Sequence, residues 1–505
     1  MLYRNPIIPG FHPDPSICRV GQDYYVVTST FEYFPGVPIF HSTDLVTWRQ
    51  IGYCLTRESQ LPIKTAGSSG GIYAPTIRWH DGTFYMIVTN VSGQGNFYVT
   101  AKQPEGPWSE PIAVTSNGKP VGGIDPSLFF DDDGKVYFSG TSGTATIDID
   151  TGALTSDLEH VWTGSGGRYA EAPHIYKLNG LYYFVFAEGG TEPGHMVTIA
   201  RSESPFGPFE PCPRNPILTH RNRGGHPIQS TGHADFVLAH DGSWWAVFLA
   251  TRVSNKYPNV HHLGRETFLA PVTWDVDGWP IVGEQGVVNL EMEAPSFMTS
   301  AEQPQNGVIR DDFDEDTLAL PWNFRRNPDP DHWSLTERPG SLMLACSPVT
   351  LNDVAQAAFV GRRQQHFTSR FSANIEFAPH GQFEEAGLVV IMNEEHHYEI
   401  FLRGSEDGSR TVAVRRRIGD LTAIVAEEPI PHGNVVLSIE STPEEYHFHY
   451  QTADGKRKVA SGSTRYLSTE VAGGFTGVLL AMYATSNHHP STTKAYFDWA
   501  EYSFE

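Results

Sequence analysis

One hairpin pattern occurs five times in the first half of the chain, and this repeat restricts the fold more than any other feature. Each copy joins a short apolar strand to an aromatic strand through a glycine turn: DPSICRVGQDYYVVTS, YAPTIRWHDGTFYMIV, DPSLFFDDDGKVYFSG, EAPHIYKLNGLYYFVF and HADFVLAHDGSWWAVF. The copies are anchored at Pro15, Pro75, Pro126, Pro173 and Asp235. The turn glycines, which follow six to eight residues later, are Gly21, Gly82, Gly134, Gly180 and Gly242.

Successive anchors are 47 to 62 positions apart. A hairpin repeated at such a period is typical of a propeller, in which each unit buries its face against its neighbours. The sequence therefore predicts an all-β fold that begins with a five-bladed β-propeller. Segments between the hairpins, such as HSTDLVTW, AKQPEGPW and ARSESPFGPF, are expected to supply the outer strands. An ordinary β-sandwich would not explain the shared offset from anchor to glycine.

Acidic residues occupy equivalent positions in three of the five copies. The first strand of each blade borders the central channel, so these positions meet around one axis. Asp14 and Asp125 lie one residue before their anchors, whereas Tyr73, Glu171 and His233 lie two residues before theirs. Carboxylates are depleted in strands, and converging carboxylates raise each other's pKa at a cost in stability. The pattern therefore indicates either a metal site or a paired acid and base.

Five motifs with specific order and spacing carry a family resemblance: GFHPDPS, GGIDPS, YAEAPHIY, STGHADFV and LGRETFLAPV. They resemble the markers of glycoside hydrolase family 43, specifically its two-domain β-xylosidase branch, over nearly the whole chain. The resemblance implies a five-bladed propeller and hydrolysis with inversion at the anomeric carbon. It also implies that Asp14 is the general base and Glu171 the general acid, with Asp125 orienting the acid and adjusting its pKa.

The resemblance implies further roles around these carboxylates. Arg265 would hold hydroxyls of the terminal sugar, Phe31 would line the pocket, and His233 would support a calcium ion or a water in the channel. Tyr73 would form part of the pocket wall, at a position where clear β-xylosidases carry Trp. In relatives an aromatic residue of the second domain closes the pocket, and Phe475 in GGFTGVLL is the candidate here. A phenylalanine of the sandwich core is the alternative for that residue.

The chemistry of an inverting glycosidase is consistent with these positions. It needs a protonated carboxyl for the leaving oxygen and an ionised carboxylate for the water, roughly 6.5–9.5 Å apart. Residues on different blades can meet that spacing, whereas neighbours on one strand cannot. Glu171 must stay protonated near neutral pH, and an ionised Asp125 nearby would raise its pKa. Asp14 is held in place because the prolines on both sides stiffen the main chain.

The pattern changes after the connector EMEAPSFMTSAEQPQNG. Alternating strands such as LVVIMN, HYEIFLR, TVAVRRR and VVLSIES predict an antiparallel β-sandwich of jelly-roll type. This part is similar to the lectin-like, concanavalin-like domain that follows the propeller in the same branch. We therefore expect a propeller over residues 1–295, a linker over 296–308 and a sandwich over 309–505.

Two sets of residues are candidates for metal binding in addition to His233. Asp312 or Asp314, together with Asp498, is expected to hold a structural calcium, and solvated turn acids are the alternative. Adjacent histidines on a strand point to opposite faces, so none of the pairs 261–262, 396–397 and 488–489 is expected to bind one ion, and the last two pairs are expected to be structural or at the surface. The first pair, shortly before Arg265, is also a candidate for lining the pocket. No organic cofactor is expected.

Net charge, cysteine spacing and the distribution of apolar residues limit the expected partners and cellular location. The formal charge of the 505-residue chain is −23, which disfavours nucleic acid and anionic membranes and suits a neutral oligosaccharide. The four cysteines have no metal-like spacing and are expected to be buried thiols. Neither a signal peptide nor a membrane-spanning run is visible. We therefore expect a cytoplasmic protein, although a chain that had lost a leader would look the same. The sequence leaves open whether the protein forms a homo-oligomer.

The main functional hypothesis is an exo-acting β-xylosidase that releases xylose from the non-reducing ends of xylo-oligosaccharides. An α-L-arabinofuranosidase, or an enzyme with both activities, is the nearest alternative, and Tyr73 in place of Trp leaves the sugar open. A carbohydrate-binding protein without catalysis is a second alternative, which the presence of all three carboxylates and Arg265 disfavours. A metal-dependent hydrolase built on His233 needs more ligands than the channel axis offers.

Overall fold

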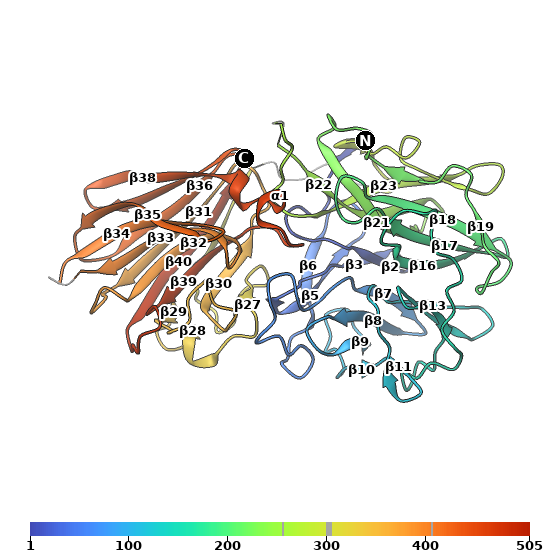
Figure 1. The fold of residues 1–505 in the computed structure, drawn as a ribbon, viewed down its shortest axis with the longest axis horizontal. Coiled ribbons are helices and arrows are strands. Elements are labelled where there is room, and N and C mark those ends of the chain that lie inside the picture. Colours follow the sequence, from blue (N-terminus) through green and yellow to red (C-terminus); the bar gives the residue numbers. More distant parts are fainter. Residues whose placement is uncertain (255–256, 299–305, 406–407) are drawn as a thin grey trace.

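The computed structural model describes residues 1–254, 257–298, 306–405 and 408–505. Within these ranges the chain forms two β domains, with the propeller in blue to green and the sandwich in orange to red (Figure 1). The helices are short: η1 (Pro330–His332), η2 (Thr464–Leu467) and α1 (Thr469–Ala472). No helix of the described ranges has the length and apolar character needed to cross a bilayer.

The propeller consists of five antiparallel sheets, each with its strands in chain order. Blade 1 contains β2 (Ser16–Val20), β3 (Asp23–Val27), β5 (Gly36–Ser42) and β6 (Arg49–Leu55). Blade 2 contains β7 (Thr76–His80), β8 (Thr83–Asn90), β9 (Gly95–Ala101) and β10 (Ile112–Ala113). Blade 3 contains β13 (Ser127–Phe130), β14 (Val136–Gly140) and β15 (Gly143–Thr146). Blade 4 contains β16 (Glu171–Leu178), β17 (Leu181–Glu188), β18 (Met196–Ser202), β19 (Glu210–Pro211) and β20 (Leu218–Thr219). Blade 5 contains β21 (Ile228–Leu238), β22 (Trp244–Arg252), β23 (Glu266–Trp274) and β24 (Pro280–Val282).

The five innermost strands close a ring: β2 neighbours β7, β7 neighbours β13, β13 neighbours β16, β16 neighbours β21, and β21 neighbours β2. Each of these strands turns into the next strand of its blade at one of the five repeated glycines, and all five glycines have positive φ. Glycine adopts this conformation without steric cost. The predicted five-bladed propeller is therefore confirmed, and the hairpin repeat is its structural unit.

The predicted outer strands were placed wrongly. HSTDLVTW, AKQPEGPW and ARSESPFGPF begin at the ends of β5, β9 and β18 and run through the turns that follow, and the outer strands begin only after them. In the first of these segments the carboxylate of Asp44 accepts hydrogen bonds from the main-chain N–H groups of Val46 and Thr47. Such local bonds favour a turn over a strand ladder.

The second domain is an antiparallel sandwich of two sheets, as predicted. The first sheet contains β26 (Gly307–Asp311), β28 (Trp333–Ser334), β29 (Leu342–Ala345), β31 (Ser369–Phe377), β36 (Val435–Ser441), β37 (Glu445–Thr452), β38 (Gly455–Ser463) and β40 (Lys494–Phe504). The second contains β30 (Ala358–Arg363), β32 (Glu385–Asn393), β33 (His396–Gly404), β34 (Arg410–Ile418), β35 (Leu421–Ile430) and β39 (Leu479–Thr485). A continuous apolar core fills the space between them.

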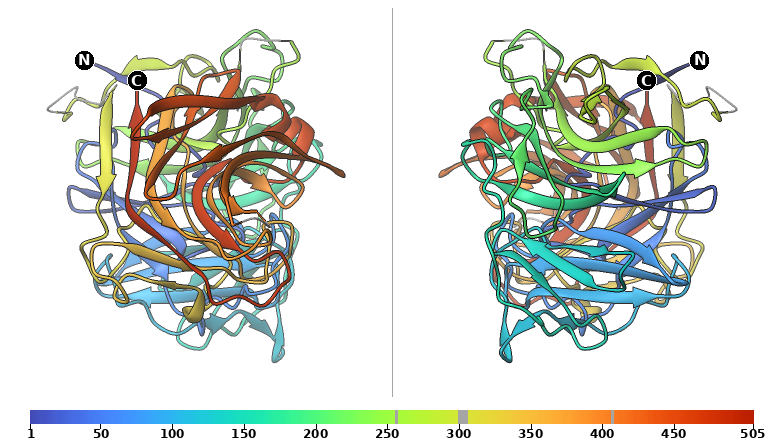
Figure 2. Two further views of the ribbon diagram at one scale, coloured as in Figure 1. Left: turned by 90° about the vertical axis from the view of Figure 1, so that its left-hand side faces the viewer. Right: turned by 90° about the vertical axis from the view of Figure 1, so that its right-hand side faces the viewer.

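The second sheet of the sandwich packs against the propeller. Phe11, Phe31 and Tyr33 of the propeller share one buried cluster with side chains of β30, β32, β33, β34 and β39. A short antiparallel pair, β4 (Tyr33–Phe34) with β27 (Phe324–Arg325), crosses the boundary. Figure 2 shows the two domains in turn from the two ends of the molecule.

The boundary strands lie near the predicted domain limits. β25 (Glu291–Glu293) pairs with β1 (Leu2–Arg4) of the propeller, and β26 begins the sandwich at residue 307, two residues before the predicted start. Most of the predicted linker, residues 299–305, lies outside the described residues.

Candidate active site

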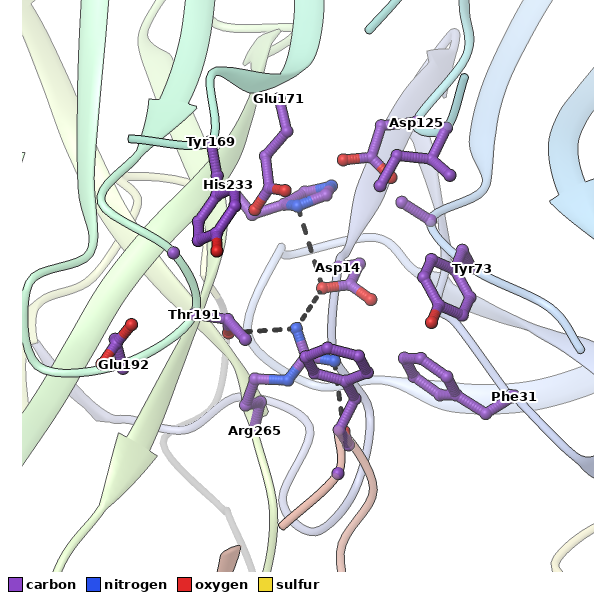
Figure 3. A pocket seen from close by; sticks show the side chains of 15 residues that line it. Asp14, Phe31, Tyr73, Asp125, Tyr169, Glu171, Thr191, Glu192, His233 and Arg265 are labelled. Carbon is purple, nitrogen blue, oxygen red and sulfur yellow. Dashed lines mark hydrogen bonds and ion pairs between the residues drawn. The ribbon is translucent and has the colours of Figure 1, made fainter. Parts of the chain in front are cut away.

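A cavity of about 360 Å³ lies at one end of the propeller channel, where the sandwich meets it (Figure 3). Its walls come from all five blades and from one loop of the sandwich. The lining residues are Asp14, Phe31, Tyr73, Ala74, Ile124, Asp125, Tyr169, Glu171, Gly190, Thr191, Glu192, His233, Arg265, Gly474 and Phe475. All eight residues predicted for catalysis or substrate binding are among them.

Asp14 stands just before β2, at the start of the first blade, and only 4% of its surface is exposed. Its φ is +55°, a left-handed conformation that aspartate tolerates better than most residues. One carboxylate oxygen accepts a hydrogen bond from Arg265 Nη1 at 2.7 Å, and the other accepts one from Ser29 Oγ at 2.6 Å. The ring of His233 is 3.8 Å away.

These partners decide the charge of Asp14. Burial alone would raise its pKa, but the Arg265 guanidinium, His233 and the Ser29 hydrogen bond together outweigh burial and lower it below the usual value. Asp14 is therefore an ionised carboxylate over the physiological pH range.

Asp125 and Glu171 form the second acidic group of the cavity. Oxygen atoms of the two carboxyls and a ring nitrogen of His233 all lie within 4.8 Å of one another. Asp125 has φ +55°, like Asp14, and accepts a hydrogen bond from the main-chain N–H of Ala172 at 3.2 Å.

Burial raises the pKa values of Asp125 and Glu171, whereas the pKa of Asp14 is lowered because its partners outweigh burial. Burial, followed by the charge of Asp14, raises the pKa of Glu171 to about 7 although Arg265 opposes the rise. Burial, followed by the charges of Glu171 and Asp14, raises the pKa of Asp125 well above its usual range. Burial is the largest cause of both rises, and the repulsion between the Asp125 and Glu171 carboxyls adds to the rise at Asp125.

Arg265 joins three parts of the cavity lining through its hydrogen bonds. It lies just before β23, donates from Nη1 to Asp14 and to Thr191 Oγ1 at 3.1 Å, and donates from Nη2 to the main-chain oxygen of Phe475 at 3.1 Å. Its guanidinium lies 5.6 Å from the ring centre of Phe31 and 5.7 Å from that of Phe475. Cation–π attraction therefore adds to the hydrogen bonds that fix this side chain.

Three aromatic rings from both domains form one wall. Phe31 and Tyr73 of the propeller are 5.1 Å apart between ring centres, and Phe475 of the sandwich lies 6.0 Å from each of them. Phe475 is 39% exposed, so its ring is placed at the rim of the cavity rather than in the sandwich core. The wall offers the apolar faces that sugar rings pack against.

Hydrogen bonds from the propeller hold the main chain at Phe475. Its N–H donates to Ser69 Oγ at 2.8 Å, and the N–H of Ser69 donates to the buried Glu32 at 3.0 Å. A Cβ on Gly474 would come within 2.6 Å of Ser69 Oγ, so the close approach requires glycine there. The neighbouring Ser68 instead bonds to Glu394 of the sandwich.

The predicted calcium ligands of the sandwich lie at its surface. Asp312, Asp314 and Asp498 are all exposed, and Asp312 pairs with Arg310 at 2.8 Å. Within the described ranges, the one group of three or more acidic, histidine or cysteine side chains close enough to share an ion is Asp125, Glu171 and His233. The assignment of Asp312, Asp314 and Asp498 to a calcium site therefore stays a prediction, and their exposure is consistent with the alternative of solvated turn acids.

The paired histidines do not line the cavity. His261 instead bonds to Glu470 of α1 at 2.7 Å, and His262 is buried against Phe367 and Tyr446. The expectation that the first pair lines the pocket is thus corrected.

Several lining or supporting residues were not predicted. Thr191 lies in the loop between β17 and β18, Ser29 follows β3, and Ser69 lies in the loop before β7. Thr191 and Ser69 lie outside the hairpin repeat, and Ser29 ends its first copy at a position where the other copies carry no serine, so no periodic signal marks them. The TST and SSG segments that contain the two serines have ordinary loop composition.

Comparisons with known proteins agree with this geometry. The family model described as glycosyl hydrolases family 43 matches residues 3–280, and the model described as the beta xylosidase C-terminal concanavalin A-like domain matches residues 310–503. A non-reducing end α-L-arabinofuranosidase of Bacteroides ovatus is 47% identical over 99% of this chain and 94% of its own length. A xylosidase/arabinosidase of Butyrivibrio fibrisolvens is 39% identical over 100% of this chain and 99% of its own length. A solved structure from Bacteroides ovatus, described as a xyloglucan PUL GH43B protein, superposes with a TM-score of 0.94 at 46% identity and covers 99% of both chains. With a propeller, a sandwich and a cavity of converging carboxyls, the chain belongs to glycoside hydrolase family 43.

Proposed function

We propose that the protein removes single pentose units from the non-reducing ends of oligosaccharides, with inversion at the anomeric carbon. The observation that carries the proposal is the contrast between two carboxyls of one cavity. Asp14 is held ionised by Arg265, whereas the pKa of Glu171 is raised to about 7. An acid and a base with separated pKa values are what the inverting reaction requires.

In this mechanism Glu171 donates its proton to the glycosidic oxygen as the bond to the anomeric carbon breaks. Asp14 takes a proton from a water whose oxygen attacks the same carbon from the opposite face. Asp14 and Glu171 belong to different blades and both point into the cavity (Figure 3), and the mechanism places the sugar and the water between them. Glu171 regains its proton and Asp14 loses its own before the next cycle.

The shape of the cavity supports exo action. Phe475 and Gly474 of the sandwich stand against the propeller at its rim, and this closure on one side favours attack at a chain end over attack within a chain. Arg265 presents its guanidinium toward the site of the terminal sugar, and such a donor matches the hydroxyls of a small ring.

Xylose and arabinofuranose are the two candidate sugars. Both relatives described above carry arabinosidase names and one also carries a xylosidase name, so we propose activity on both. Parallel kcat/KM measurements on aryl β-xyloside and aryl α-L-arabinofuranoside test this proposal. Binding of xylobiose without cleavage of any of these substrates would instead support a non-catalytic sugar-binding protein.

The roles of the two carboxyls can be separated with a leaving-group test. Glu171→Ala should lose far more activity on a natural disaccharide than on an aryl glycoside, because an activated leaving group needs little protonation. Asp14→Ala should lose activity on both substrates alike. Equal losses for Glu171→Ala on the two substrates would contradict its role as the acid.

Hydrolysis of this kind needs water and no organic cofactor, and we propose that it also needs no calcium. Calcium prefers hard oxygen ligands, whereas His233 offers a nitrogen. Glu171 also cannot donate a proton while it binds a cation. We expect dialysis against a chelator to leave activity unchanged. The four buried free thiols and the charge of −23 favour a cytoplasmic protein without nucleic acid or anionic membranes as partners.

A further inference from the structure

A second cavity, of about 230 Å³, lies at the edge of the sandwich and shares no lining residue with the catalytic cavity. We call it the sandwich-edge pocket. It opens between β26, β30, β31 and β40. Its lining residues are Ile309, Arg310, Asp311, Ala319, Pro321, Trp322, Arg362, Phe371, Ala500, Glu501 and Tyr502. Its volume is many times the roughly 15 Å³ that one water needs.

Arg362 is a buried cation in this pocket with little compensation. The residue is 5% exposed, and its Nε has no hydrogen-bond partner in the described part of the chain. Its one recorded hydrogen bond is a long one, from Nη2 to the neutral amide oxygen of Gln365 at 3.4 Å. The guanidinium lies over the ring of Tyr502, 4.4 Å from its centre. Burial lowers the pKa of Arg362 to about 10, so it still carries its charge at neutral pH.

Four of the five other buried arginines of the described ranges also have one nitrogen without a partner, but their remaining nitrogens have closer acceptors. Arg265 binds Asp14 at 2.7 Å, and Arg325 and Arg326 both pair with Glu394. Arg363 and Arg410 have no carboxylate partner, but each donates to main-chain oxygens at 2.9 Å or less: Phe11 for Arg363, Phe377 and Gly433 for Arg410. A buried cation without such acceptors costs stability, so Arg362 has donors available for an external acceptor.

The acidic residues of the pocket do not supply that acceptor. The two oxygens of Asp311 accept hydrogen bonds from Trp322 Nε1 at 2.7 Å and from the N–H of Phe313 at 2.9 Å. No ion pair joins Arg362 to Asp311 or Glu501 in the described structure. Both acidic residues are nevertheless close enough to repel a doubly charged ligand. The lining thus favours a monoanion over a dianion.

We propose that the sandwich-edge pocket binds the carboxylate of a small organic acid, including a sugar acid, with Arg362 as its cationic anchor. A guanidinium matches a carboxylate with two parallel hydrogen bonds. The room beside Arg362 admits a ring attached to that carboxylate. Because the net charge of −23 opposes anions at long range, binding must come from this local contact.

The test is calorimetric titration of the full-length protein with four probes. Sodium glucuronate and acetate carry a carboxylate with and without a sugar ring, sulfate is the dianionic probe, and xylose is the neutral sugar. We expect both carboxylates to bind outside the catalytic cavity and binding to weaken at least tenfold in Arg362→Met. Arg338→Met is the control, because Arg338 is on the same sandwich but pairs with Glu376 at 2.8 Å.

A second variant guards against a folding defect in Arg362→Met. Gln365→Glu should place a carboxylate of the chain itself beside Arg362 and thereby abolish binding of the external one, while raising the melting temperature. No carboxylate binding, equal binding by wild type and Arg362→Met, or binding of sulfate alone would overturn the proposal. Hydrolytic activity should not change in either variant, so the result does not depend on the proposed reaction.

Discussion

Replacing Glu171 by glutamine tests the electrostatics of the active site through protein stability rather than through activity. Burial, followed by the charge of Asp14, raises the pKa of Glu171 from 4.5 to about 7. One unit of pKa corresponds to about 1.4 kcal/mol. The rise therefore corresponds to about 3 kcal/mol of the free energy of unfolding, which Glu171 contributes at low pH and which is lost at high pH.

The sign follows from proton binding. Folded Glu171 holds its proton more tightly than unfolded Glu171, so its contribution to stability is fully present below pH 4.5 and is lost as the pH rises through about 7. Glutamine carries no titrating proton, so residue 171 of the variant makes no pH-dependent contribution to stability. The stability of Glu171→Gln relative to wild type should therefore increase by about 3 kcal/mol between pH 4.5 and pH 8.

The assay is urea unfolding of wild type and variant at pH 4.5 to 8, in which hydrogen exchange of propeller peptides monitors the unfolding. This readout separates the propeller from the sandwich, since two domains need not unfold together. Glu203→Gln is the matched control because Glu203 is an exposed glutamate of the same domain, and its difference from wild type should not depend on pH. A difference for Glu171→Gln that stays constant over this range would refute the reasoning.

Three further predictions concern the residues around the carboxyls. Ser69→Ala removes the hydrogen bond to the N–H of Phe475 and should lower kcat/KM about three- to tenfold, from a loss of about 0.5–1.5 kcal/mol. Ser68→Ala should lower kcat/KM less, and equal effects of the two variants would count against the positioning role of Ser69. Arg265→Met should raise the pKa of Asp14, so the acidic limb of the pH–rate profile should move to higher pH while kcat/KM falls at least a hundredfold; an unmoved limb would contradict the ion pair. Tyr73→Trp should shift the ratio of xyloside to arabinofuranoside hydrolysis toward the xyloside, and an unchanged ratio would show that this wall does not select the sugar.

The propeller could be predicted because each hairpin carries its own local signals. The turn glycines all adopt positive φ, and the residues before Pro15 and Pro126 turn out to be the left-handed Asp14 and Asp125. Position in the repeat therefore located the carboxyls without any tertiary information. Arg265 lies outside the repeated hairpin, and only the family resemblance identified it.

Other features depend on contacts that sequence does not encode locally. Whether Asp125 is ionised follows from burial and from two neighbouring carboxyls on other blades, which no local pattern reports. The support of Phe475 by Ser69 joins residues 406 positions apart. The calcium site of the sandwich stays a prediction, because acidic spacing in a sequence does not show whether exposed side chains such as Asp312 and Asp498 share an ion.

The stereochemistry of hydrolysis tests the central claim most directly. Proton NMR of the first turnovers on xylobiose or on an aryl pentoside identifies the anomer before it equilibrates in solution. The account predicts that the released sugar first appears with the anomeric configuration opposite to that of the substrate, because Asp14 activates a water across from Glu171. A product that first appears with the configuration of the substrate would contradict it.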